Sequence, residues 1–203
     1  SMPYIVVIVD ESTDNTKNIA LNYTKFVYEG SWSKEGERRN FGLSKCQNEW
    51  ILEIDADEIV EKDLAREIIE KVSYGDKDYF YLPLLNYVCN IPIKYGWMAC
   101  LAPDGKYCLF RKSSKVWKKG RVHPEYEIKG RKGPKLKNFI NHYMSKDISD
   151  LIIRFDRNTT LSAIDLNENK KNLKKFFSKR KILSRFIKCF IVRKGFKKLG
   201  IGF

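Results

Sequence analysis

Two aspartates, one residue apart, follow an apolar segment in EWILEIDADE, residues 49–58. The mainly apolar residues 50–54 predict a buried strand, so Asp55 and Asp57 come where that strand ends. Residues i and i+2 of a strand point to the same side, and neighbouring carboxylates repel each other unless a cation lies between them. Mg²⁺ binds one or two protein carboxylates together with water and substrate phosphates. The spacing therefore indicates a metal site, although a solvated acidic turn that begins the next helix would show the same pattern.

The elements that position these aspartates alternate between strand and helix. Continuous apolar segments predict buried strands, whereas Leu64, Ile68 and Val72, each four residues apart, predict an amphipathic helix. This order implies a parallel sheet with helices on both faces, and ligands bind at the carboxyl ends of such strands. The predicted strands are residues 3–10, 25–30 and 49–54, and the predicted helices are residues 12–25, 34–48 and 60–72.

The middle of the chain has a different pattern. Strand-like segments separated by turn signals such as PDG and KGRKGP indicate a mixed second part of the sheet. After them, the spacing of Leu151, Phe155 and Thr159 predicts a helix within residues 147–164. The strand-like segments are residues 78–88, 105–112, 121–130 and 137–144.

Positive charge is concentrated at the C-terminal end of the chain. The formal net charge is +14, and thirteen Lys and Arg residues lie between Lys170 and Lys198, with no acidic residue after Glu168. The preceding part is therefore close to neutral. We expect one globular domain at residues 2–168, followed by a basic amphipathic helical tail at residues 169–203.

The tail also carries an apolar stripe, formed by Phe176, Leu183, Ile187 and Phe190 at helical spacing. Amphipathic helices with basic faces lie in membrane interfaces and prefer anionic lipid. Two alternatives are a helix packed on its own domain and an arm that binds nucleic acid. The long apolar stripe favours an anionic membrane surface as the partner of residues 170–203, and we expect no nucleic acid.

The cysteines and the hydropathy of the chain indicate its cellular compartment. The five cysteines are odd in number and scattered, without a CxxC pair, which indicates a reducing environment. No apolar segment approaches the roughly 18 residues of a membrane-spanning helix. We therefore expect a cytoplasmic protein that is peripheral to the inner face of the cytoplasmic membrane.

Several motifs in this order resemble a known enzyme family. Asp10 with STDNT, then RRN, then WILEIDADE resemble family 2 glycosyltransferases with the GT-A fold, which is an α/β, Rossmann-like, mostly parallel sheet flanked by helices. CLFRK, GRVHPE and INHY resemble the bacterial subgroup that includes the lipopolysaccharide core β-glucosyltransferases. The resemblance covers roughly residues 4–165 and implies the roles that follow.

The first implied role is binding of a nucleotide sugar such as a UDP-sugar. Asp10 would accept a hydrogen bond from the base, with Glu11 beside it, and Asp55 would contact the ribose or the metal. Arg39 and Asn40 correspond to a pair that lies near the nucleotide. Each residue also has a simpler explanation, because Asp10 could close a turn, Arg39 could be solvated and Asn40 could cap a helix.

The second implied role is catalysis with a divalent cation. Asp57 would ligate Mg²⁺ or Mn²⁺ at the sugar-nucleotide diphosphate, with Asp55 and His142 as further metal ligands. Inversion needs a base that takes the proton of the acceptor hydroxyl. Glu125 is the first candidate for this base and His123 the second.

Together these roles imply an inverting, metal-dependent hexosyltransferase. It would move a sugar from a nucleoside-diphosphate donor to a saccharide or lipid-linked acceptor, in the synthesis of cell-surface polysaccharide or lipopolysaccharide. The alternatives are a catalytically weak GT-A-like protein that binds or scaffolds, and a basic nucleic-acid-binding protein.

Three departures from the family pattern qualify these expectations. The family's first turn usually has one more residue before STD, which would shift the placement of Asp10. The family's HE pair is HPE here, which would move Glu125 to the opposite face of a strand unless Pro124 introduces a bulge, and Glu127 competes for the same role. The family also begins with a strand and a helix ahead of the segment with which this chain begins. A sheet edge left uncovered in this way predicts a homo-oligomer.

Overall fold

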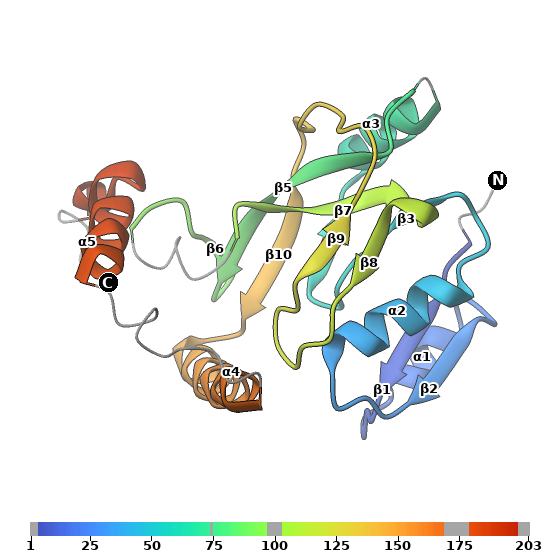
Figure 1. Ribbon diagram of the computed structural model, residues 1–203, viewed down its shortest axis with the longest axis horizontal. Helices are drawn as coiled ribbons and strands as arrows, with labels where there is room; N and C mark the ends of the chain where they lie inside the picture. Colours follow the sequence, from blue (N-terminus) through green and yellow to red (C-terminus); the bar gives the residue numbers. More distant parts are fainter. Residues whose placement is uncertain (1–3, 74, 97–102, 169–178, 199–203) are drawn as a thin grey trace. The chain divides into compact units, whose positions relative to one another are not determined.

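The computed structural model describes residues 4–73, 75–96, 103–168 and 179–198 (Figure 1). The chain divides into two compact units. Unit 1 comprises Ser1–Glu53, Gly75–Phe80 and Cys108–Gly133, and unit 2 comprises Ile54–Tyr74, Tyr81–Tyr107 and Pro134–Phe203.

Unit 1 begins with a β–α–β segment, as predicted. Strand β1 (Val7–Asp10) pairs in parallel with β2 (Val27–Gly30), and helix α1 (Thr16–Leu21) connects them. Asp14 closes the turn before α1, because its Oδ1 accepts hydrogen bonds from the Thr16 N–H and the Ser12 hydroxyl. These hydrogen bonds, with Thr16 the larger cause, lower the pKa of Asp14 to about 2, so the carboxylate stays ionised. Helix α2 (Glu35–Lys45) follows β2.

The remainder of unit 1 is antiparallel. Strand β3 (Trp50–Leu52) pairs with the end of β7 (Gly105–Arg111), and a 3₁₀ turn then leads into the hairpin of β8 (Lys115–Trp117) and β9 (Tyr126–Ile128). The core of the unit is apolar and fully buried, as expected from the continuous apolar segments. Its buried side chains are Val9, Ile51, Phe80, Cys108, Leu109 and Phe110.

Unit 2 is built on β10 (Ile140–Ser145). This strand runs parallel to β5 (Tyr79–Val88), which also carries the short antiparallel strand β6 (Ile91–Pro92) (Figure 1). It also pairs antiparallel with β4 (Glu58–Val60). Helix α3 (Lys62–Ser73) buries Leu64 and Ile68, which confirms its predicted inward face. The other buried apolar side chains are Leu82, Leu84, Val88, Ile93, Leu136 and Ile140.

Helices form the C-terminal part of unit 2. Helix α4 (Ile148–Glu168) follows β10 directly and buries no residue completely. Helix α5 (Lys179–Ile187) continues into a π-helical turn (Lys188–Val192) and a 3₁₀ turn (Gly195–Lys198). Among the described residues, no helix has both the length and the hydropathy needed to cross a membrane. Phe176, one member of the predicted apolar stripe, lies outside the described residues.

The predicted α/β class is confirmed, whereas the mostly parallel sheet is not. Strands β1 and β2 form a sheet of their own, and the larger sheet is mixed, with the order β3-β7-β5-β10-β4. The predicted third strand is shorter than expected, and β3 pairs antiparallel with β7 instead of joining β1 and β2. Long-range pairing of this kind depends on partner strands that a local apolar pattern does not reveal.

Candidate functional site

Asp10, the last residue of β1, has both carboxylate oxygens engaged within unit 1. Its Oδ1 accepts a hydrogen bond from the Trp32 N–H at 3.1 Å, and its Oδ2 accepts one from Arg38 at 2.8 Å. Glu11 follows in a left-handed conformation (φ 49°) and accepts a hydrogen bond from the Ser31 hydroxyl. Both acids therefore hold the loop after β2, beside the Arg38 cation.

Arg39 and Asn40 join helix α2 to strand β8. The Arg39 guanidinium donates to Glu35 and Glu53 and lies 4.8 Å from the Trp117 ring, a cation–π distance. Asn40 pairs with the backbone of Trp117 in both directions, through its amide N–H to the carbonyl at 2.8 Å and from the Trp117 N–H to Oδ1 at 2.9 Å. The two side chains are thus fixed by contacts inside unit 1.

Glu53 is the centre of this network, which the sequence did not reveal. Besides Arg39, it accepts hydrogen bonds from Lys115 at 3.2 Å and from the Trp117 indole at 3.2 Å. The Lys115 side chain is only 3% exposed, and burial lowers its pKa although Glu53 works in the opposite direction. A cation this deeply buried beside a carboxylate holds the base of the hairpin in place.

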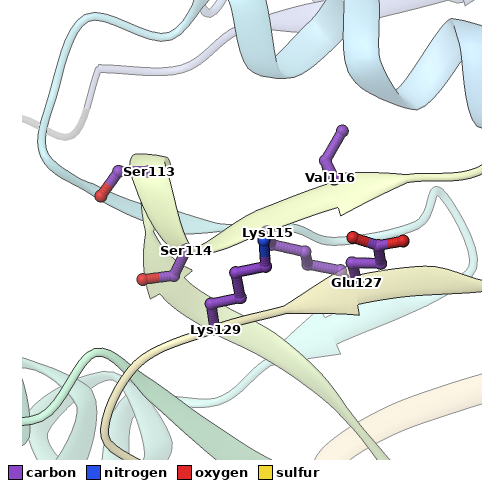
Figure 2. A pocket seen from close by; sticks show the side chains of 6 residues that line it. All are labelled: Ser113, Ser114, Lys115, Val116, Glu127 and Lys129. Atoms are coloured by element: carbon purple, nitrogen blue, oxygen red, sulfur yellow. The ribbon is translucent and has the colours of Figure 1, made fainter.

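A small cavity adjoins the same lysine (Figure 2). Its volume is about 130 Å³, well below the roughly 300 Å³ at which ligand pockets begin, so it is too small for a nucleotide sugar. The six side chains that line it are Ser113, Ser114, Lys115, Val116, Glu127 and Lys129.

His123 and Glu125 lie in the turn between β8 and β9. His123 has a left-handed backbone (φ 47°), and its N–H donates to Glu35. Glu125 precedes β9 instead of lying in it, so the predicted change of strand face does not apply. Its side chain is 74% exposed, with Lys118 at 3.9 Å, and Glu127 lies 3.6 Å from the same lysine. The two acids therefore share one cation at the surface of unit 1.

The predicted metal ligands all belong to unit 2. The DADE segment is a tight turn in which the Glu58 N–H donates to the Asp55 carbonyl and the Asp55 N–H donates to the Glu58 side chain. Lys106 donates to the carboxylates of both residues, at 3.0 Å for Asp55 and 2.6 Å for Glu58. Asp55 is thus neutralised by a lysine that follows the PDG turn.

Asp57 faces two nitrogen-bearing side chains. Its Oδ2 lies 3.7 Å from His142 Nε2 and 3.7 Å from Arg154 Nη1. The Tyr143 N–H donates to the Asp57 carbonyl at 2.8 Å, which fixes the turn against β10. His142 lies in β10 between Glu58 of β4 and Asn86 of β5, and its Nδ1 is 2.7 Å from Asn86 Oδ1.

A divalent cation needs several ligands arranged around it. Among the described residues, no group of three or more His, Cys, Asp or Glu side chains is arranged to hold a metal. Asp57 and His142 nevertheless form a pair whose 3.7 Å separation is too long for a hydrogen bond. Neighbouring ligands of an octahedral cation at about 2.1 Å lie about 3.0 Å apart, so Asp57 and His142 would have to approach each other by about 0.7 Å to share one cation, which would take its other ligands from phosphates and water.

The structure adds three side chains to the predicted set: Lys106, Asn86 and Arg154. Asn86 had a signal in the sequence, because it is a polar residue inside the otherwise apolar DYFYLPLLNYV. Lys106 and Arg154 had no such signal, because only the fold brings them close to the DADE turn. Lys106 is 51 residues from Asp55 in the sequence, and Arg154 is 97 residues from Asp57.

Part of this chain is similar in sequence to a known protein family. Residues 4–96 match the model of glycosyl transferase family 2, a segment that includes β1, α2 and the DADE turn. The mixed α/β fold is consistent with a GT-A-like domain.

Several proteins similar to this chain are named as glycosyltransferases. An uncharacterised glycosyltransferase of Rickettsia prowazekii (strain Madrid E) is 25% identical over 95% of this chain and 68% of its own length. Uncharacterised glycosyltransferases of Rickettsia felis and Rickettsia typhi are 41% and 38% identical over 64 residues, which are 32% of this chain and 23% and 22% of their own lengths. These matches support a glycosyltransferase, and residues 4–96 are similar to glycosyl transferase family 2.

Proposed function

We propose that the protein is an inverting, metal-dependent glycosyltransferase that transfers a sugar from a nucleoside-diphosphate sugar, such as a UDP-sugar, to a saccharide or glycolipid acceptor. The observation that carries this proposal is the family 2 match over residues 4–96, which includes Asp10, Arg39 and the DADE turn. A role in cell-surface polysaccharide or lipopolysaccharide synthesis rests on the sequence resemblance alone.

The cation of this proposal is Mg²⁺ or Mn²⁺, held by the Asp57 carboxylate and His142 Nε2, with Asp55 as a further ligand. The imidazole favours Mn²⁺, because Mg²⁺ takes oxygen ligands. When bound, the cation supplies Lewis-acid stabilisation of the leaving diphosphate. Arg154, 3.7 Å from Asp57, adds positive charge where the diphosphate would lie. Asp55 would have to give up its ion pair with Lys106, at 3.0 Å, to bind the cation.

Glu125 is the proposed base, and Glu127 is its competitor. Glu125 is exposed and its ion pair with Lys118 is long, so its carboxylate is accessible to an acceptor hydroxyl. A carboxylate within hydrogen-bond reach can remove the hydroxyl proton as the new glycosidic bond forms. In this proposal Asp10 and Arg38 of unit 1 bind the nucleotide, and Arg38 supplies positive charge for it.

Calorimetric titration of the protein with UDP and Mn²⁺ tests the proposal. The wild type is expected to bind UDP only with Mn²⁺ present. Asp57→Ala is expected to bind UDP at least about 10-fold more weakly, because a ligand of the cation is gone. Asp63→Ala, which removes an exposed acid from α3, is the matched control and keeps the wild-type affinity. Absence of UDP binding by the wild type, or unchanged binding by Asp57→Ala, contradicts the proposal.

We also propose that the α5 segment binds the anionic inner surface of the cytoplasmic membrane. Residues 179–198 contain no acidic side chain, and their large apolar side chains are exposed. Exposed apolar side chains beside clustered Lys and Arg suit an anionic lipid interface. The exposed side chains are Ile182, Leu183, Phe186, Ile187, Phe190, Ile191, Val192 and Phe196.

A further inference from the structure

Asn86 is a buried polar residue whose amide is used at both ends. It is 6% exposed in strand β5, between apolar neighbours. Its Nδ2 donates to the Pro103 carbonyl at 3.1 Å, and its Oδ1 lies 2.7 Å from His142 Nδ1. Because a carbonyl can only accept, the NH₂ end of the amide must face Pro103, and Oδ1 is left to face the imidazole.

The orientation of this amide decides which nitrogen of His142 carries the proton. Asn86 Oδ1 is an acceptor, so His142 Nδ1 must be the donor. In the neutral imidazole the lone pair then lies on Nε2, the atom that faces Asp57 Oδ2 at 3.7 Å. A lone pair directed at a carboxylate is unfavourable unless a cation lies between the two or a second proton binds Nε2 and makes the contact an ion pair.

Strand register fixes this arrangement. His142 is the direct neighbour of Asn86 in the parallel β5–β10 pair, so no flexible loop separates the two side chains. Metal-ligating histidines typically donate their other ring N–H to a carbonyl or carboxylate, which orients the ring and sets the tautomer. The Asn86 amide supplies such an acceptor before any cation binds.

We infer that Asn86 is a positioning residue, which holds His142 as the Nδ1–H tautomer and keeps Nε2 as a free ligand directed at Asp57. The metal-binding consequence rests on the proposed function above, whereas the tautomer does not. Without the Oδ1 acceptor, the proton would move to Nε2, where Asp57 becomes the best available acceptor. The lone pair of His142 would then lie on Nδ1, and Nε2 would have none to offer a cation beside Asp57.

Nitrogen-15 NMR of the imidazole rings in the metal-free protein tests the tautomer directly. The chain contains only two histidines, so a His123→Gln variant assigns the signals. At about pH 8.5, above the ordinary imidazole pKa of about 6.5, wild-type His142 is expected to carry its proton on Nδ1. Asn86→Leu is expected to move the proton to Nε2, and Asn86→Asp, which keeps an acceptor, is expected to leave it on Nδ1.

Manganese binding measured by electron paramagnetic resonance, with UDP present, tests the consequence. Asn86→Leu is expected to weaken Mn²⁺ binding about 10- to 100-fold, while Asn86→Asp stays within a few-fold of the wild type. Asn141→Leu, an Asn→Leu change in β10 whose amide lies near Glu61 instead, is the matched control and keeps the wild-type affinity.

The outcomes separate this inference from the proposed function. A wild-type His142 with its proton on Nε2, or an unchanged tautomer in Asn86→Leu, overturns the role of Asn86. Should Asn86→Leu fail to fold, the wild-type and Asn86→Asp spectra still decide the question. A wild type with the Nδ1–H tautomer that binds no Mn²⁺ supports the role of Asn86 and refutes the metal site.

Discussion

At the scale of single residues, the Asp57 carboxylate of unit 2 lies beside an imidazole and a guanidinium. His142 Nε2 and Arg154 Nη1 both lie 3.7 Å from its Oδ2, so a cation that binds there must compete with a guanidinium. Arg154 also pairs with Asp150 on its own helix, which gives it an alternative partner when Asp57 is occupied. In the proposed site, Arg154 would therefore keep Asp150 as a partner while it contacts a ligand phosphate.

Arg154→Gln is expected to have opposite effects on two ligands. Mn²⁺ alone should bind about two- to fivefold more tightly, because a partly exposed competing cation contributes about 1 kcal/mol or less. UDP in the presence of Mn²⁺ should bind more weakly, because a charge near the diphosphate is lost. Titrations followed by electron paramagnetic resonance and calorimetry measure the two affinities. Arg157→Gln, a more exposed arginine of α4, is the control, and equal effects from both variants would contradict this account.

At the scale of elements, close approach of backbones determines how α2 meets the β8–β9 hairpin. The Gly36 N–H donates to the Gly120 carbonyl at 3.2 Å, and a Cβ atom on Gly36 would lie 1.9 Å from the Lys118 carbonyl oxygen. The helix and hairpin that carry Arg39, Asn40 and Glu125 can therefore approach each other only because residue 36 has no side chain.

Gly36→Ala and Gly42→Ala form a matched pair within helix α2. Gly36→Ala is expected to destabilise the protein by at least about 1–3 kcal/mol, since backbone must move to admit the methyl group. At Gly42 an added Cβ would lie 3.1 Å from the Ile8 side chain, which must shift slightly, so Gly42→Ala should cost less than Gly36→Ala because helix propensity offsets this contact. Urea unfolding measures both, and equal midpoints would contradict the close-approach argument.

Glu67 connects helix α3 to the segment that precedes β10. Its carboxylate accepts hydrogen bonds from the Lys137 and Asn138 backbone N–H groups and from the Asn138 amide, at 2.8–2.9 Å. Burial alone would raise the pKa of Glu67, but these hydrogen bonds outweigh it and lower the pKa. The ionised form thus stabilises the folded chain above the unfolded pKa of about 4.3, and this contribution disappears as the pH falls through the lower folded pKa.

Glu67→Gln is therefore expected to be destabilising at neutral pH and nearly neutral in acid. An amide in place of the carboxylate turns an NH₂ group toward N–H donors, which costs about 1–3 kcal/mol. The difference from the wild type in the free energy of unfolding should shrink as the pH falls below about 4.3. Denaturant unfolding at pH 7 and pH 3 measures this change. Glu70→Gln, on the exposed side of α3, should show little difference at either pH, and a pH-independent cost for Glu67→Gln would contradict the argument.

At the scale of the whole molecule, local patterns predicted elements better than they predicted pairings. The 3.6-residue period of Leu64 and Ile68 gave α3 its buried face, and the apolar segments around Phe80, Phe110 and Ile140 are strands of the core. Strand β4 was missed, because three residues after an acidic turn have no recognisable alternation. Antiparallel pairing of β3 with β7 could not be predicted, since it joins residues about 60 positions apart.

The same limit applies to the candidate site. Asp55, Asp57 and His142 belong to one unit, as a shared metal site requires, but the contact of Asn86 with His142 depends on the register of two strands. Arg39 and Asn40 were predicted to lie near a nucleotide, and their contacts here are with Glu53 and Trp117. Their role in nucleotide binding remains a prediction, as do those of Asp10, Glu11, His123 and Glu125.

Membrane binding is the prediction that concerns the molecule as a whole. The full chain is expected to float with vesicles that contain anionic lipid and to dissociate as salt increases, because each basic residue near the surface contributes about 1 kcal/mol and is screened within a Debye length. Replacement of Phe186 and Phe190 by Ser should abolish flotation, whereas the same change at Tyr23, an exposed aromatic residue of unit 1, should not. Flotation that survives the Phe substitutions, or retention of nucleic acid in a gel shift, would contradict this proposal.

The antiparallel pairing of β4 with β10 has a consequence for how the protein folds. His142 lies between Glu58 and Asn86, and the Tyr143 N–H binds the Asp57 carbonyl, so a slip of β10 by one residue would turn the imidazole to the opposite side of the sheet. Correct register of β10 is therefore needed to bring His142 beside Asp57. If the proposed site binds manganese and nucleotide, the thermal stabilisation that they cause would report native strand alignment during refolding, and a misaligned fraction would not respond to them.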